Sequence, residues 1–207
     1  NYTFNNVYFA GLIKFSDGKD TKLGDKIEDT QGDFIKTIFN DFESIKKEAG
    51  VSQLVLKLVD SYMNAKSRNP KLTSRRLSED DGIIIKQEID GTLFSIEVLC
   101  PIVSKINSSP CLRWFTDDSK TINGNSLVLK VTYGKRTVLL GGDLNEDYEN
   151  YVISNHKNID KFQAEVYKSG HHGSRDFSVK FLEKIKPNAT IFSSGDNENF
   201  DHPSASA

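Results

Sequence analysis

Histidine is scarce in this sequence, which has four among its 207 residues and none before His156. No apolar run approaches the roughly 18 residues that a helix needs to cross a bilayer, so no membrane segment is expected in this chain. The formal net charge is −2, which argues against the broad basic surface of a non-specific nucleic-acid binder. With 37% hydrophobic and 27% charged residues, we expect a single globular domain over residues 1–207.

Cysteine is almost absent as well. Cys100 and Cys111 lack CxxC spacing and lie far along the chain from the paired histidines, so neither is expected to bind a metal. We interpret them as reduced, structural thiols of an intracellular protein, with a disulfide as the alternative. The N-terminus is not typical of a signal peptide and has no initiator methionine, so we expect a processed chain, a fragment or the ordered part of a longer protein.

The spacing of apolar residues predicts the secondary structure. Strands are expected at residues 7–15, 82–89, 92–100, 126–133, 136–140, 164–168 and 189–193. Helices are expected over 34–45, 54–62, 145–155 and 177–186, and loops over 16–32, 66–76 and 104–123. Hairpins followed by alternating strands and helices indicate mixed sheets with helices on their outer faces, a layered α/β or α+β fold.

Four side chains that can bind a metal follow predicted strands. Asp143 comes after two glycines at the end of an apolar run, His171 and His172 are adjacent and flanked by glycine, and His202 lies in a late loop. Such strands hold their terminal side chains rigidly, and flanking glycines let a ligand approach the backbone closely. One carboxylate with two or three imidazoles suits Zn²⁺ or Mn²⁺. Taken singly, Asp143 is also typical of a turn and His202 of a loop, and we interpret His156 as a surface or C-cap residue.

Together these runs resemble a known family. The runs Asn123-Gly-Asn-Ser-Leu-Val-Leu-Lys130, Leu139-Leu-Gly-Gly-Asp143, Lys168-Ser-Gly-His-His-Gly-Ser174 and His202-Pro203 are similar to those of metallo-β-lactamase-fold hydrolases. Within that family they look most like the ComEC-like subgroup, named for a domain of the bacterial DNA-uptake channel protein. The resemblance is strongest over residues 123–203. It implies an αββα sandwich with two divalent metal ions, Zn or Mn, at one edge between the sheets.

The resemblance also implies roles for the metal-binding side chains. Asp143 matches the carboxylate that bridges the two metals, and His202 matches the late histidine that completes the shell of the second metal. His171 and His172 match the paired histidines, of which one is expected to be a ligand or to give a proton to the leaving group. We therefore expect Asp143, His171 and His202 as metal ligands, and His171 and His172 as catalytic residues.

Three further residues are expected near the substrate on the same grounds. Ser174 and Arg175 would hold the histidine loop or contact a substrate anion. Asn125, together with Ser126, stands where many relatives place another metal-binding histidine, and Asn125 is expected to face the substrate.

One departure from the family limits what this chain is expected to do. The family's His-x-His-x-Asp-His loop, which supplies most ligands of both metals, has no counterpart here. We therefore expect a sandwich that is incomplete at both ends, an incomplete metal site, and activity in the intact protein of a bacterial cytoplasm. The predicted function is metal-dependent hydrolysis of a phosphodiester, in nucleic acid or a nucleotide. The alternatives are a catalytically inactive binding or scaffold module of the same fold, and an ester or thioester hydrolase.

Overall fold

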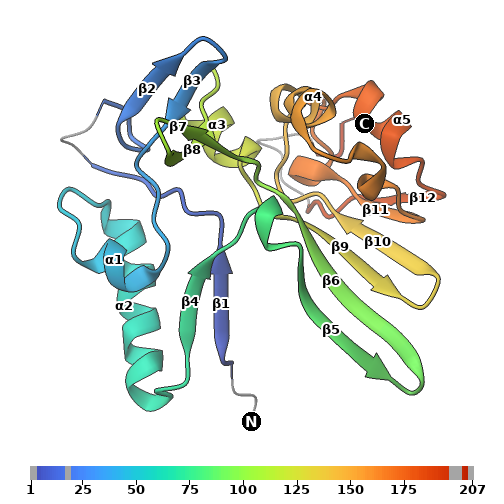
Figure 1. Cartoon of the computed structure of the whole chain (residues 1–207), viewed down its shortest axis with the longest axis horizontal. Helices are drawn as coiled ribbons and strands as arrows, with labels where there is room; N and C mark the ends of the chain where they lie inside the picture. Colours follow the sequence, from blue (N-terminus) through green and yellow to red (C-terminus); the bar gives the residue numbers. More distant parts are fainter. Residues whose placement is uncertain (1–3, 17–19, 196–201, 205–207) are drawn as a thin grey trace. The chain divides into compact units, whose positions relative to one another are not determined.

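The computed structural model describes residues 4–16, 20–195 and 202–204 (Figure 1). It is a mixed α and β structure with three sheets, which confirms the predicted class at that level. The chain divides into two compact units: unit 1 is Asn1–Leu77 with Val103–Asp118, and unit 2 is Ser78–Ile102 with Ser119–Ala207. That residues 1–207 form one domain stays a prediction. Among the described residues, no helix combines the length and apolar character needed to span a bilayer.

Unit 1 contains two sheets and two helices. Its strands are β1 (Asn6–Phe9), β2 (Lys26–Asp29), β3 (Gly32–Ile35), β4 (Thr73–Arg76), β7 (Val103–Ile106) and β8 (Ser109–Arg113). Strands β1 and β4 pair in parallel, and the others form an antiparallel sheet in the order β2-β3-β8-β7. Helices α1 (Phe42–Lys46) and α2 (Gln53–Arg68) pack on a buried cluster that includes Phe15, Phe42 and Val59.

Several predictions for unit 1 are wrong. Residues 34–35 belong to β3 instead of a helix, because Phe34 and Ile35 pair with residues of β8 and are buried there. The predicted loop 104–123 contains β7, β8 and α3 (Asp118–Gly124). The predicted strand 7–15 ends at Phe9, and Gly11 two residues later has a φ of +100°, which a strand does not allow. The predicted second helix is confirmed by α2.

Unit 2 is built on a six-stranded sheet in the order β12-β11-β10-β9-β6-β5. Its elements are η1 (Glu79–Asp81), β5 (Ile83–Ile89), β6 (Thr92–Cys100), α3, β9 (Val128–Tyr133), β10 (Arg136–Leu140), α4 (Glu146–Asn155), η2 (Ile159–Phe162), β11 (Val166–Lys168), η3 (Gly170–Gly173), α5 (Val179–Ile185) and β12 (Ala189–Ile191). The predicted hairpins are confirmed, and Asp90 and Gly91 both have positive φ at the first turn. Strands β10, β11 and β12 run parallel to one another, so their carboxyl ends meet at one edge of the sheet.

The two faces of this sheet differ. Helices α4 and α5 lie on one side of the strands β10–β12 (Figure 1), where Leu139 and Tyr167 are buried. The register brings one row of apolar side chains together on the opposite face, namely Ile85, Ile96, Val131, Val138, Val166 and Ala189. Each of these six is half-buried or exposed. Helices therefore cover one face of the sheet at β10–β12, while the opposite face is apolar along this row and incompletely covered.

Candidate functional site

The candidate site lies where the three parallel strands of unit 2 end. Asp143 follows β10, His171 and His172 follow β11, and Ser193 follows β12. Backbone hydrogen bonds tie the loops together: the N–H of Gly141 donates to the carbonyl of Lys168 at 3.1 Å, and that of Ser169 to the carbonyl of Ile191 at 3.0 Å. The carboxyl edge of parallel strands is the usual place for ligand binding in open α/β sheets.

A cavity of about 510 Å³ opens at this edge. It is lined by Asp143, His171, His172, Ser193, Ser194, Gly195 and His202. The structure thus places all four predicted metal-binding or catalytic side chains around one cavity, although His202 is 30 or more residues from the others in sequence. A volume of this size is in the range of small-molecule binding sites, which is roughly 300–1,000 Å³.

The ring of His172 is oriented by a backbone carbonyl. Its Nδ1 lies 2.7 Å from the carbonyl oxygen of Ser193, and because a carbonyl only accepts, Nδ1 carries the hydrogen. In the neutral ring the lone pair is then on Nε2, which lies 3.5 Å from Oδ1 of Asp143. An imidazole lone pair and a carboxylate oxygen that face each other are both donors to a cation. A carbonyl that fixes the tautomer in this way is the common second contact of metal-binding histidines.

His171 and His202 form the second pair of the cavity. Their ring centroids are 5.7 Å apart with an interplanar angle of 62°. Nδ1 of His171 is buried without a hydrogen-bond partner among the residues that the structure describes. Within those residues, no group of three or more His, Cys, Asp or Glu side chains is arranged to hold a metal. The imidazole and carboxylate donors, with one buried nitrogen left over, nevertheless match the donor chemistry of Zn²⁺ and Mn²⁺.

The turn that carries the two histidines has an unusual backbone. His171 has φ 43° and His172 has φ 58°, and Gly173 follows with φ 86°. Each non-glycine residue in the left-handed region costs about 1–2 kcal/mol, so the surrounding contacts must stabilise this turn. The N–H of His171 donates to the carbonyl of Gly142 at 3.1 Å, and that of Ser174 to the carbonyl of His171 at 3.0 Å. Strain of this kind is often found where side chains are held for function.

The glycines around Asp143 are required by close approach. Gly142 has φ 60°, and a Cβ on it would lie 2.7 Å from Cβ of Ser126. The hydroxyl of Ser126 in turn accepts a hydrogen bond from the N–H of Asp143 at 3.2 Å. This packing fixes the backbone that presents the Asp143 carboxylate to the cavity.

The three predicted substrate-binding residues lie outside the described lining of the cavity. Asn125 is fully buried, and its Nδ2 donates to the carbonyl of Thr121 at 2.8 Å. Ser174 accepts a hydrogen bond from the N–H of Asp176 at 3.2 Å, a contact within the histidine loop. Arg175 is exposed. Their roles toward a substrate stay predictions.

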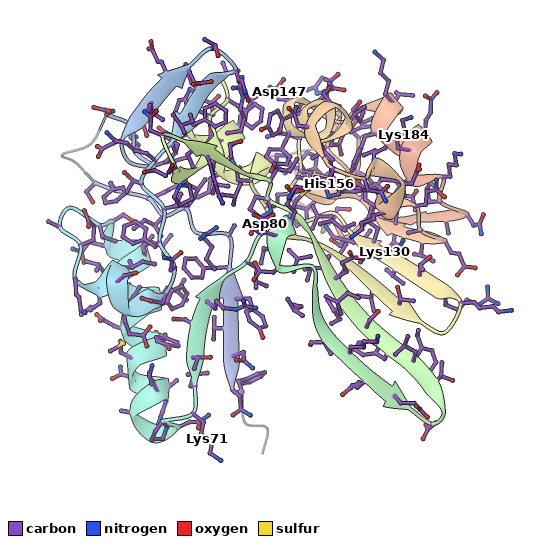
Figure 2. All side chains as sticks on the ribbon, in the orientation of Figure 1. Lys71, Asp80, Lys130, Asp147, His156 and Lys184 are labelled. Atoms are coloured by element: carbon purple, nitrogen blue, oxygen red, sulfur yellow. The ribbon has the colours of Figure 1, made fainter. Side chains whose placement is uncertain are left out.

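The fourth histidine, His156, is a C-cap residue of α4, as one of its two interpretations predicted. Its ring packs against Phe162 with centroids 4.9 Å apart, and its Nε2 lies 3.4 Å from Oε2 of Glu79. Figure 2 labels it near Asp80, and its side chain is 5% exposed. Burial lowers the pKa of His156, which keeps the ring neutral and structural.

Sequence reasoning missed two buried residues behind the histidine turn, Glu149 of α4 and Tyr167 of β11. Helix α4 was predicted as an acidic helix, and Glu149 looks like one more of its exposed carboxylates. The burial of Glu149 could have been predicted from its position in the helix. It lies beside Tyr148 and about one turn before Val152, and both of these residues are buried. Ser193 was also missed, because it acts through its backbone carbonyl and has no side-chain signature.

Comparison with known proteins gives one curated relative and no matching family model. The chain is 36% identical to ComE operon protein 3 of Bacillus subtilis (strain 168) over 87 residues. The match covers 42% of this chain and 11% of that relative, so the chain spans a small part of the relative's length. This similarity supports a relationship with the ComEC-like proteins, as the sequence motifs predicted.

Proposed function

We propose that this chain carries part of the active site of a metallo-β-lactamase-fold hydrolase that cleaves a phosphodiester. The observation that carries the proposal is the pairing of Asp143 and His172 across 3.5 Å at the carboxyl edge of three parallel strands. Asp143, His171 and His202 would hold divalent metal, with His172 beside them as a proton donor. A bound Zn²⁺ or Mn²⁺ would supply a water of lowered pKa and a positive charge near the substrate.

The sheet of unit 2 supports the sandwich part of this proposal. An apolar sheet face needs a second layer to remove it from water, and in a sandwich that layer is another sheet. The row from Ile85 to Ala189 is such a face, because all six side chains are apolar and none is fully buried. Helices α4 and α5 already cover the other face. A second sheet over the apolar row would complete an αββα arrangement.

The residues of this chain can perform two tasks in the reaction. Because the carbonyl of Ser193 accepts from Nδ1 of His172, Nε2 faces the cavity, and the doubly protonated ring would pass the proton on Nε2 to the leaving oxygen of the substrate. Asp143, fixed through its own N–H, would orient the metal. The phosphodiester class rests on the resemblance of the motifs to the ComEC-like subgroup, and the cavity volume of about 510 Å³ is compatible with a nucleotide-sized group.

The test measures metal content and hydrolysis together. The 207-residue chain and the complete gene product are dialysed against Mn²⁺ or Zn²⁺, analysed for bound metal, and assayed with bis(p-nitrophenyl) phosphate. Asp143→Asn should abolish metal binding. Asp147→Asn is the matched control, because Asp147 lies at the start of α4 (Figure 2) and pairs with Lys120 at 2.9 Å.

The outcomes separate the alternatives. Metal uptake that is unchanged by Asp143→Asn, or the absence of uptake in the complete gene product, would overturn the proposal. Metal binding with hydrolysis of an ester or a thioester but no phosphodiester would indicate the ester or thioester hydrolase. Metal binding without any hydrolysis would indicate the inactive binding or scaffold module.

A further inference from the structure

Behind the histidine turn lies a buried chain of hydrogen bonds that the proposed metal site does not use. Glu149 of α4 is 2% exposed and Tyr167 of β11 is 5% exposed. The Glu149 carboxylate accepts from the N–H of Ser178 at 2.5 Å, and the Tyr167 hydroxyl lies close enough to act on the pKa of this carboxyl. The same hydroxyl accepts from the N–H of Gly170 at 3.0 Å. This series of contacts therefore connects the start of α5 with the histidine turn through the Glu149 carboxylate and the Tyr167 hydroxyl.

Gly170 is the residue of the histidine turn that the series of contacts reaches. It is the first residue of η3 and directly precedes His171, where the backbone enters the left-handed region. A Cβ on Gly170 would lie 2.9 Å from the carbonyl oxygen of Leu144 and 3.4 Å from the Tyr167 hydroxyl, so the turn rests closely on both. The hydrogen bond that the Gly170 N–H donates to the Tyr167 hydroxyl thus fixes the peptide from which the two histidines project.

A side chain that only filled space at position 149 would not require a hydrogen-bond acceptor. A buried polar side chain loses its hydration, and an apolar side chain of similar volume avoids that cost. Glu149 instead accepts from the N–H of Ser178 and has the hydroxyl of Tyr167 close by, so it interacts with two different elements. The tyrosine can donate to the carboxylate and still accept from Gly170, so both ends of the chain are satisfied.

We propose that Glu149 and Tyr167 are positioning residues that hold the turn so that His171 and His172 face Asp143. This inference rests on the proposed function, since the turn is taken to present metal ligands. Contacts one step behind metal-binding side chains commonly change metal affinity by about 10–100-fold when they are removed. Neither residue lines the cavity within the described part of the chain, so each would act through the turn.

The test compares Tyr167→Phe with Tyr148→Phe in the full chain. Tyr148 is the matched control, because its buried hydroxyl also accepts from a backbone N–H, that of Ile102 at 2.7 Å, away from the histidine turn. Affinity for Mn²⁺ and Zn²⁺ is measured by titration, and amide hydrogen exchange of Gly170 and His171 is measured in the metal-free protein. Tyr167→Phe should weaken metal binding by about 10-fold and speed exchange at both amides by about 5-fold.

Tyr148→Phe should lower the melting temperature by about as much as Tyr167→Phe does. It should leave the metal affinity and the amide exchange of Gly170 and His171 unchanged. Glu149→Gln retains an oxygen acceptor and should keep most of the metal affinity, whereas Glu149→Ala should lose it. Tyr167→Phe with unchanged metal affinity and unchanged exchange would overturn the inference, and so would equal effects of the two tyrosine variants. If wild type itself binds no metal, the proposed function fails, and the exchange comparison in the metal-free protein still decides whether the pair holds the turn.

Discussion

Replacing Glu149 by glutamine should change how the stability of unit 2 depends on pH. Burial raises the pKa of this carboxyl to about 7, and the charges of Asp176 and Glu146 act in the same direction. The N–H of Ser178 and the hydroxyl of Tyr167 oppose this effect but do not outweigh it. Glutamine has nearly the same shape and carries no titrating proton, so the variant removes the linkage while it preserves the packing.

The size of the effect follows from the two pKa values. The usual pKa of 4.5 applies to the unfolded chain, and about 7 applies to the folded protein, a difference of about 2.5. At about 1.36 kcal/mol for each unit, this corresponds to about 3 kcal/mol. Between these pH values the folded protein binds more protons than the unfolded chain, so this stabilisation is complete below pH 4.5 and is lost as the pH rises through 7. About 2–3 kcal/mol of it should disappear between pH 5 and pH 8.

The measurement is urea unfolding of wild type and Glu149→Gln at pH 5, 6, 7 and 8. Trp114 belongs to unit 1, so far-UV circular dichroism and amide exchange of α4 are the suitable probes for unit 2. His156 and Glu79 also have shifted pKa values in unit 2, but both are present in both proteins and cancel in the difference. A difference in unfolding free energy that stays constant from pH 5 to 8, or that changes in wild type's favour as the pH rises, would refute the reasoning.

Three further predictions test the histidine turn, unit 1 and the thiols. Gly173→Ala should destabilise unit 2 by about 2–4 kcal/mol, because Gly173 has a φ of +86° and a Cβ there would lie 2.5 Å from an aromatic carbon. The control Gly91→Ala should cost about 1 kcal/mol in the same melting assay, because Gly91 has a φ of +73° and a Cβ there would have no atom within 4 Å. Equal losses of stability in the two variants would contradict the steric argument. Burial acts to raise the pKa of Glu43, but hydrogen bonds, first from Lys66, lower it to about 2. Unit 1 should therefore lose stability as the pH falls from 4.5 toward 2, and Glu43→Gln should flatten this acid limb in tryptophan fluorescence; an unchanged limb would contradict the assignment. Both cysteines are free and buried, and burial raises the pKa of the Cys100 thiol. Ellman's reagent should therefore label Cys100 only after the protein unfolds. Rapid labelling of the native protein would show that Cys100 is not buried.

Local signals were sufficient for much of unit 2 because two of its strand pairs are hairpins. The Asp90-Gly91 turn joins β5 to β6, and a short turn joins β9 to β10, so pattern and pairing agree. Helix α4 begins at its predicted position, where the side chain of Asn145 accepts from the N–H of Tyr148. When turn, period and cap all favour the same element, the sequence alone locates it to within a residue or two.

The wrong helix prediction at residues 34–35 has its origin in tertiary contacts. The apolar residues between Phe34 and Ile45 are spaced like a helical stripe, yet Phe34 and Ile35 are buried as strand residues opposite Arg113 and Leu112. One partner strand, β8, lies far along the chain, and the other, β2, lies in the segment predicted as a loop, so the spacing of residues 34–45 reports neither. A short apolar segment is compatible with a strand or a helix, and the tertiary partner decides between them.

For the candidate site, the sequence could identify the donors but not their orientation. Asp143 and His172 were recognisable because glycines and strand ends surround them. The contacts that fix their geometry come from the backbone: the carbonyl of Ser193 holds the His172 ring, and the N–H of Gly170 holds the turn. Every residue type has these groups, so sequence patterns carry no record of them. The positive φ of His172 could not be predicted for the same reason. Residues other than glycine disfavour this conformation, so it persists only where backbone contacts outweigh its energetic cost.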